Sequence, residues 1–373
     1  MDDSKKEKRK KVIIFIVAVI IILTAAFLII LPPGGGKLPK CTSPKGLSER
    51  TTLTVDGVDL GLILLSDDVS APVLLVCGGG PGIPQYLLES LYPSPLPHEF
   101  TVCYWDYRGT GISYSPDIRA ENMTTGRFID DTIAVTDYLA QRFNKEKISI
   151  MGHSFGTAIA LQTVQKYPEK YECYIAMSQI CDQRLSEYTA FDHMKKQYED
   201  MGDKKMCAEF AKYDIRGSES DYESYRSSGL RDKAMHGTGV GTTRDMKNVM
   251  TGLFFPSLRC PAYTQGERIN TWKSKFTLSE NCPASKDTND LNVFENVPAV
   301  DIPVYFIVGK YDMTCCASLQ QEYYEAIDAP EKKIYIFENS AHSPLYEEYD
   351  RGMQVLREIR DSNVMQDDTL PKV

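Results

Sequence analysis

The chain has 373 residues, which is enough for one large α/β domain with an insertion or for two small domains. Apolar residues make up 42% of it and charged residues 25%, and these ordinary proportions exclude wholesale disorder. The formal net charge of -9 argues against nucleic acid as the main partner.

The N-terminus combines a basic head with an apolar run. Residues 1–11 carry six Lys and Arg against three Asp and Glu, and residues 12–31 contain no charged side chain. Twenty helical residues match the hydrocarbon thickness of a bilayer. We therefore expect a transmembrane signal-anchor helix at 12–31, with the basic head in the cytoplasm and the rest of the chain outside it. A cleaved signal peptide is the alternative, although a shorter apolar run would be typical of one.

Residues 32–48 are rich in Pro, Gly and Lys and predict a flexible linker. The segments 51–55 and 60–65 flank Asp56-Gly57, which is a hairpin signal. Short apolar strands and amphipathic helices then alternate along the chain, which predicts a parallel sheet covered on both faces. The further strands are expected at 72–77, 101–105, 148–151, 172–180, 304–308 and 333–337, and the helices at 125–143, 155–167, 316–326 and 346–359.

Residues 182–297 interrupt this alternation. They are polar, rich in Tyr, Ser, Asp and Lys, and contain no strand-like run. We expect them to form a cap over the carboxyl edge of the sheet. The core domain is then predicted from 49–181 and 298–361, and a polar tail from 362–373.

Residues 152–156 have the sequence Gly-His-Ser-Phe-Gly, which fits the pattern G-x-S-x-G. In this pattern the serine lies on a tight turn between a strand and a helix, and the two glycines allow the backbone to fold close to itself. The pattern alone is weak, but here a predicted strand leads directly into it and a predicted helix leads out. Ser154 is therefore a candidate nucleophile, with a buried structural turn as the alternative.

A serine hydroxyl is a poor nucleophile unless a base removes its proton and a further group orients that base. Asp312 follows the predicted strand at 304–308, and His342 follows the strand at 333–337. Of the five histidines, only His342 lies after the last two strands, where the base would meet the serine. Ser154, Asp312 and His342 are therefore the predicted catalytic triad. The alternative for Asp312 is a turn-forming aspartate, and the alternative for His342 is a histidine on the protein surface.

Acyl transfer also needs N–H donors for the oxyanion that develops in the transition state. The backbone N–H of Phe155 lies at the start of a predicted helix and is one candidate. The glycine-rich run 77–82, which follows a strand, can supply the second. No G-K-[ST] follows these glycines, as a phosphate-binding loop would require. Zinc-type spacing of His and Cys is also missing from the sequence, so we predict neither a metal nor an organic cofactor.

Two further segments resemble motifs of the prolyl iminopeptidase family of α/β hydrolases. Residues 79–82, Gly-Gly-Pro-Gly, resemble the end of its H-G-G-P-G motif, and residues 105–113 resemble its W-D-Q-R-G-x-G-x-S segment. The resemblance implies an α/β-hydrolase fold, with a mostly parallel eight-stranded sheet, helices on both faces and an inserted helical cap. It also implies Gly80 as the second oxyanion donor and buried structural roles for Asp106 and Arg108.

The chain departs from that family at the positions that bind substrate. Gly78 replaces the first His of the H-G-G-P-G motif. The W-x-x-W-E pattern near the amine-binding carboxylates is absent, because Trp105 and Trp272 are the only tryptophans. Three cap carboxylates are candidates for holding a substrate amine, with a solvated surface role as the alternative: Glu187, Glu223 and Glu267.

Three functions remain open from the sequence. The first is a membrane-anchored serine aminopeptidase of prolyl iminopeptidase type, which would release an N-terminal residue from peptides. The second is an esterase or lipase-like enzyme acting on carboxylic esters. The third is a non-catalytic receptor, which the presence of a complete triad and glycine loop argues against. The expected partners are a small peptide or ester and, through the N-terminal helix, a membrane.

Overall fold

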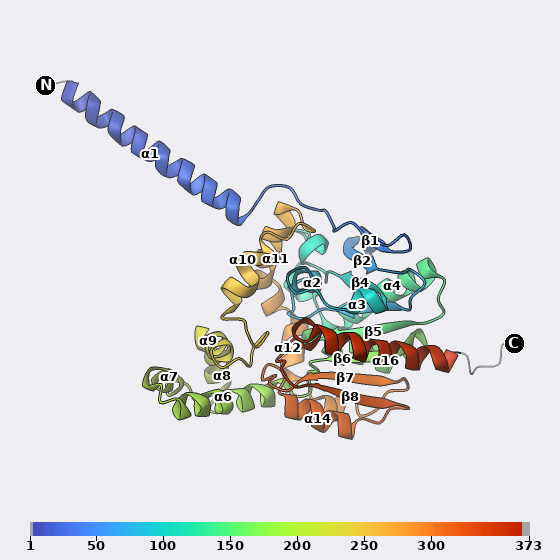
Figure 1. The fold of residues 1–373 in the computed structure, drawn as a ribbon. Coiled ribbons are helices and arrows are strands. Elements are labelled where there is room, and N and C mark those ends of the chain that lie inside the picture. The colour runs from blue at the N-terminus through green and yellow to red at the C-terminus, as the bar shows by residue number, and fades with distance from the viewer. Residues whose placement is uncertain (1–2, 368–373) are drawn as a thin grey trace.

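The computed structural model describes residues 3–367, so residues 1–2 of the predicted basic head and 368–373 of the predicted polar tail lie outside the described residues. An eight-stranded sheet forms the centre of the protein, in the order β1-β2-β4-β3-β5-β6-β7-β8 (Figure 1). The strands are β1 (Leu47–Val55), β2 (Val58–Ser66), β3 (Val73–Cys77), β4 (Thr101–Trp105), β5 (Ile148–His153), β6 (Tyr171–Met177), β7 (Val304–Gly309) and β8 (Lys332–Phe337).

The sheet is mostly parallel, as predicted. β1 and β2 form an antiparallel hairpin through Asp56 and Gly57, both of which have positive φ, and β2 also pairs antiparallel with β4. All other neighbours are parallel. In β3, side chains alternate between the two faces, so that Leu75 and Leu74 belong to different hydrophobic clusters. Both faces are therefore buried, which explains why the parallel strands have uninterrupted apolar sequences.

Helices cover the two faces. The first cluster includes side chains of α4 (Thr125–Phe143), α5 (Phe155–Lys166) and α14 (Ala317–Ala326). The second includes those of α2 (Gln85–Leu91), α3 (Leu96–Glu99), α15 (Pro344–Glu347) and α16 (Tyr349–Asp367). Because the parallel strands point the same way, the loops after β3, β5, β7 and β8 all meet at one edge of the sheet.

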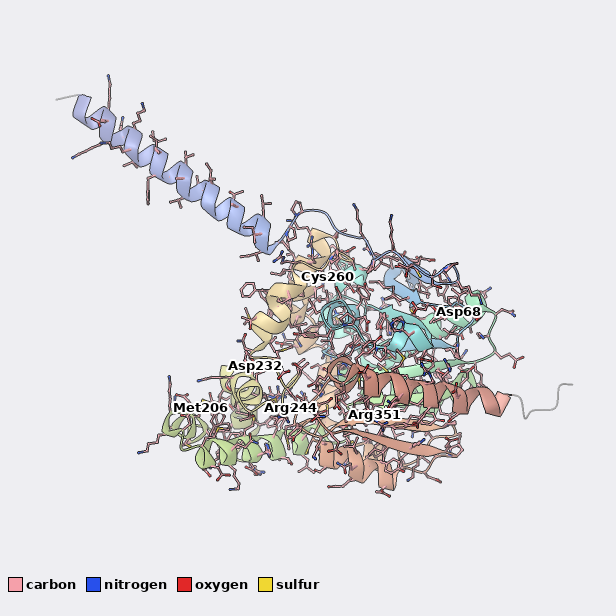
Figure 2. All side chains as sticks on the ribbon, viewed as in Figure 1. Asp68, Met206, Asp232, Arg244, Cys260 and Arg351 are labelled. Atoms are coloured by element: carbon pink, nitrogen blue, oxygen red, sulfur yellow. The ribbon has the colours of Figure 1, made fainter. Side chains whose placement is uncertain are left out.

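The chain between β6 and β7 is helical and lies at that edge (Figure 1). Part of it has a hydrophobic cluster of its own. Arg244 lies where the cap meets the core (Figure 2): its N–H donates to Glu347, and its guanidinium stacks 3.5 Å from the ring centre of Tyr311. The cap elements are α6 (Gln183–Asp200), α7 (Lys204–Phe210), α8 (Glu219–Arg226), α9 (Gly229–Gly237), η4 (Met250–Phe254), α10 (Phe255–Ser257), α11 (Gln265–Thr277), η5 (Ser279–Asn281), α12 (Pro283–Asp290) and α13 (Val293–Asn296).

Helix α1 (Asp3–Ile30) projects away from the domain (Figure 1). It includes most of the predicted basic head as well as the apolar run, because Lys, Arg and Glu are good helix formers. Within the residues that the structure describes, no helix reaches both the length and the apolar character needed to cross a membrane. The transmembrane helix predicted at 12–31 is therefore not supported as a membrane span.

The segment after α1 is attached to the cap. The guanidinium of Arg268 donates to the carbonyls of Pro32 and Gly34 at 2.7 and 2.8 Å. The side-chain amide of Gln265 donates to the carbonyl of Leu31. The flexible linker predicted at 32–48 is thus held along its first residues by α11, because its exposed carbonyls find donors there.

Candidate active site

Ser154 lies on a strained turn between β5 and α5. Its φ of 55° and ψ of -124° are unusual for a residue with a side chain, and such backbone strain is concentrated at functional sites. A Cβ on Gly152 would lie 2.6 Å from the Cα of Thr157, and one on Gly156 would lie 1.9 Å from the carbonyl oxygen of Cys77. Both positions therefore require glycine, as the pattern G-x-S-x-G predicts.

His342 and Asp312 are brought together by the loops after β8 and β7. The Nδ1 of His342 lies 3.0 and 3.1 Å from the two carboxylate oxygens of Asp312. Both side chains are buried. Burial opposes ionisation of Asp312, but the charge of His342 and the hydrogen bonds from His342 and the Cys315 N–H outweigh it, and the pKa of Asp312 lies below its usual value. The pair is thus suited to hold Nδ1 protonated, which leaves Nε2 able to accept a proton.

The glycine loop after β3 lies against Ser154. A Cβ on Gly79 would be 3.2 Å from the Cβ of Ser154. The N–H of Gly79 donates to the side chain of Gln85, so this amide is already occupied. Gly80, with a φ of 122°, is the next amide and stays the predicted second oxyanion donor, together with the N–H of Phe155 at the start of α5.

A thiol also lies beside the predicted nucleophile. The thiol of Cys315, on the loop that carries Asp312, lies near the side chain of Ser154 and donates to the side-chain oxygen of Gln183 at 3.9 Å. Burial, followed by the nearby charge of Asp312, raises the pKa of Cys315 well above its ordinary value, so the thiol stays protonated. It is therefore a poor competing nucleophile. No sequence pattern indicated this neighbour.

Glu187 is the predicted cap carboxylate that comes nearest to this loop. It is buried and accepts two hydrogen bonds from Arg231, at 2.6 and 2.7 Å, and a third from Gln183. Burial opposes its ionisation, but the charge of Arg231 outweighs it, and the pKa of Glu187 lies below its ordinary value. Gln183 also donates to the carbonyl of Thr314, two residues from Asp312. Glu187 is thus connected to the edge that carries Ser154, but its charge is already balanced.

The other two predicted carboxylates have different surroundings. Glu223 is exposed on α8. Glu267 caps α11 through the N–H of Thr264 and forms an ion pair with Arg50 on β1. The structure therefore does not bring either side chain to Ser154. Glu223 has the solvated surface position given as the alternative, whereas Glu267 is partly buried in a capping and ion-pair role that we did not predict.

In the segment 105–113, the side chains of Asp106 and Arg108 are buried and form hydrogen bonds inside the protein. Arg108 donates to both oxygens of Asp131, at 2.7 and 3.0 Å, inside the protein. Asp106 accepts hydrogen bonds from the N–H of Ile112 and the hydroxyl of Tyr263 in the cap. Burial raises the pKa of Asp106 to about 7, even though both hydrogen bonds favour its charged form.

The raised pKa of Asp106 makes stability depend on pH. An unfolded aspartate titrates near 4, so the folded state binds this proton more tightly, and its contribution is fully present below pH 4 and lost as the pH rises towards 7. In the wild type, the free energy of unfolding should fall by at most about 4 kcal/mol over this pH range because of Asp106. We expect the Asp106→Asn variant to lose this pH-dependent fall. Urea unfolding at several pH values measures it. The exposed carboxylate variant Asp117→Asn is the control, and a wild-type profile parallel to that of Asp106→Asn would contradict the expectation.

Among the described residues, no group of three or more His, Cys, Asp or Glu side chains is placed to hold a metal ion. The chemistry available at this edge is that of a serine, a histidine–aspartate pair and backbone N–H donors. Such a constellation can transfer an acyl group.

Comparison with known proteins agrees with this arrangement. A family model described as the alpha/beta hydrolase fold matches residues 72–349. A probable aminopeptidase of Bacillus subtilis (strain 168) is 32% identical over 310 residues, which is 82% of this chain and 93% of that protein. A proline iminopeptidase of Saccharolobus solfataricus is 24% identical over 77% of this chain and 84% of its own length. The crystal structure of a proline iminopeptidase from Mycobacterium smegmatis has the same fold, with a TM-score of 0.59 and 16% identity over 86% of this chain and all of its own.

Proposed function

Because the chain belongs to the α/β-hydrolase fold family, and is therefore a hydrolase that resembles the prolyl iminopeptidases, we propose that it is a serine aminopeptidase. The observation that carries the serine mechanism is the hydrogen bond between His342 and Asp312, at the sheet edge where Ser154 occupies its strained turn. The printed names of its relatives, an aminopeptidase and a proline iminopeptidase, support the peptidase activity.

The proposed reaction has two acyl-transfer steps. His342 takes the hydroxyl proton of Ser154 as the oxygen attacks the scissile carbonyl carbon, and the N–H groups of Gly80 and Phe155 hold the oxyanion. His342 then gives this proton to the leaving amine, and the C–N bond breaks. A water molecule attacks the resulting ester, again through His342, and releases the N-terminal residue as an acid. Asp312 orients His342 throughout.

An esterase is the second candidate function, and a specific observation favours it. An aminopeptidase needs a carboxylate to hold the free amine of its substrate, but Glu187 is already paired with Arg231. A substrate amine would have to displace this arginine or share the carboxylate with it. An ester substrate has no such requirement. The two candidates therefore differ in how they use Glu187.

Hydrolysis of a substrate panel by the purified full chain separates these functions. The panel pairs amino-acid anilides, with free or blocked N-termini, with short and long acyl p-nitrophenyl esters. An aminopeptidase should cleave only the free-amine anilides. For such a substrate we expect the double variant Glu187→Gln/Arg231→Gln, which removes both charges together, to raise KM at least about tenfold, since an ionic hydrogen bond contributes about 1.5–3 kcal/mol.

Glu223→Gln on the exposed face of the cap is the matched control and should leave KM unchanged. Cleavage of esters alone, with no turnover of any anilide, would contradict the aminopeptidase proposal and favour the esterase.

We also propose that α1 attaches the enzyme to a membrane through its exposed apolar side chains. Residues 12–31 carry no charge, and apolar side chains such as Ile13, Phe15 and Ile29 are at least 60% exposed. Figure 2 shows that the side chains of α1 project into open space along its length. Apolar surface of this kind is stabilised by lipid.

Flotation of the full chain with lipid vesicles tests this attachment. The wild type should float with the vesicles after an alkaline wash. The Ile16→Lys/Ile20→Lys variant should stay in the dense fraction, because each charge near the centre of an apolar helix costs about 3 kcal/mol in a bilayer. Val69→Lys, at an exposed apolar position in the hydrolase domain, is the control and should float. A wild-type protein that does not float would contradict the proposal.

A further inference from the structure

A buried glutamine connects the glycine loop to the residue beside Ser154. Gln85 lies at the start of α2, and its side-chain oxygen accepts the N–H of Gly79 at 3.1 Å. Its side-chain nitrogen lies 2.9 Å from the hydroxyl of Tyr346 and 3.0 Å from Nδ1 of His153. All donors and acceptors of this amide therefore point to groups around the candidate active site.

His153 continues this connection to the predicted base. Its Nε2 lies 3.0 Å from the main-chain carbonyl oxygen of His342. A carbonyl only accepts, so Nε2 must carry the proton, and Nδ1 of the neutral ring is then free to accept from Gln85. Burial, followed by the nearby charge of His342, lowers the pKa of His153 to about 3, which keeps the ring neutral at ordinary pH. One tautomer thus satisfies both hydrogen bonds.

The main chain of His342 is held by few other contacts. Its carbonyl also accepts the hydroxyl of Ser178, at 2.9 Å, and its N–H donates to the carbonyl of Gly241 in the cap at 3.2 Å. Of these, only the bond from His153 leads back to the glycine loop. His153 and Gln85 therefore form a direct hydrogen-bonded connection between the main chain of the base and the glycine loop.

The sequence of the glycine loop is consistent with this arrangement. Gly78 stands where the resembling family has histidine, and a Cβ at this position would lie only 2.9 Å from the Cβ of Gln85. A residue with a side chain at position 78 would therefore clash with Gln85 in its present position. Gly78 allows Gln85 to approach the loop and bind the neighbouring amide of Gly79.

We propose that Gln85 and His153 are positioning residues: the hydrogen-bond chain from Gly79 through Gln85 and His153 to His342 fixes the distance between the oxyanion loop and the base. This inference rests on the proposed serine mechanism. It assigns no bond making or breaking to either residue. Loss of the chain should slow acyl transfer without weakening substrate binding, because a displacement of about 1 Å at the reacting groups is enough to reduce the rate.

Steady-state kinetics of the full chain test the proposal, on the best substrate found in the panel. We expect His153→Ala and Gln85→Leu each to lower kcat by about 10- to 100-fold while KM changes less than twofold. The double variant should be little slower than either single variant, because both changes break the same chain. His153→Gln, whose side-chain amide can still donate to the carbonyl of His342, should recover most of kcat.

Thr163→Val on α5 is the matched control, since its buried hydroxyl bonds only within its own helix. It should leave kcat unchanged even if it lowers the unfolding midpoint. Fully additive effects of His153→Ala and Gln85→Leu, or a kcat within twofold of wild type in either folded variant, would overturn the proposal. If His153→Ala does not fold, the kcat of Gln85→Leu still tests the proposal, because this change does not alter the turn at Ser154. Full turnover by Ser154→Ala would instead refute the serine mechanism itself.

Discussion

Ser154→Ala should lower kcat at least about 10³-fold on any substrate that the wild type cleaves, while the protein keeps its unfolding midpoint. Removing the nucleophile leaves only binding and oxyanion stabilisation, which retain a small part of the rate enhancement. Active-site labelling with a fluorophosphonate should disappear in parallel, because no other hydroxyl occupies the strained turn. Substrate turnover and labelling by the purified variant measure both effects.

The neighbouring thiol provides the control for this result. The thiol of Cys315 lies near the side chain of Ser154, so an unexpected nucleophile at this site would most readily be this residue. Its raised pKa argues against such a role. We expect Cys315→Ala to keep kcat within about threefold of wild type. Turnover by Ser154→Ala close to the wild-type rate, lost in the double variant Ser154→Ala/Cys315→Ala, would contradict a serine mechanism.

Gly156→Ala should destabilise the protein by about 3 kcal/mol or more and abolish activity. The new Cβ would lie 1.9 Å from the carbonyl oxygen of Cys77 and 2.7 Å from that of Gly78, and neither backbone atom can rotate away. Overpacking usually costs about 1–3 kcal/mol where side chains can shift, so a backbone clash should reach the upper end or exceed it. Urea unfolding of the variant measures the loss.

A second glycine makes this prediction specific. Gly126 is exposed near the start of α4, and a Cβ there would meet only the side chain of Thr124, at 4.0 Å. Gly126→Ala should therefore be neutral or stabilise the protein by up to about 1 kcal/mol, as alanine does in a helix. Equal unfolding midpoints for the two alanine variants would show that the turn at Ser154 tolerates a side chain at 156.

The parallel core could be predicted because periodicity and turn chemistry agree there. α4 begins and ends at the predicted residues 125 and 143, where Thr124 caps its first turn and Asn144 adopts a left-handed conformation at its end. The order of the strands also indicated where Asp312 and His342 would lie. Their contact follows from the shared edge of β7 and β8, whereas their catalytic roles stay a prediction until a variant is measured.

The contacts that the sequence did not reveal join residues far apart along the chain. Gln85 lies on a short helix that we did not predict, and its partners His153 and Tyr346 are 68 and 261 residues away. Glu187 was a reasonable candidate as an isolated carboxylate, but Arg231, 44 residues later, neutralises it. No local pattern reports such pairs, because they depend on how elements far apart in the sequence pack within the core and within the cap.

The attachment of residues 31–34 to α11 has a mechanical consequence. A pull on α1 reaches the domain first through Arg268 and Gln265, which belong to the cap rather than to the sheet. The same cap supplies Gly241, whose carbonyl holds the main chain of His342. Tension applied at the N-terminus should therefore load the cap, which also touches the base, before it reaches the sheet at the start of β1.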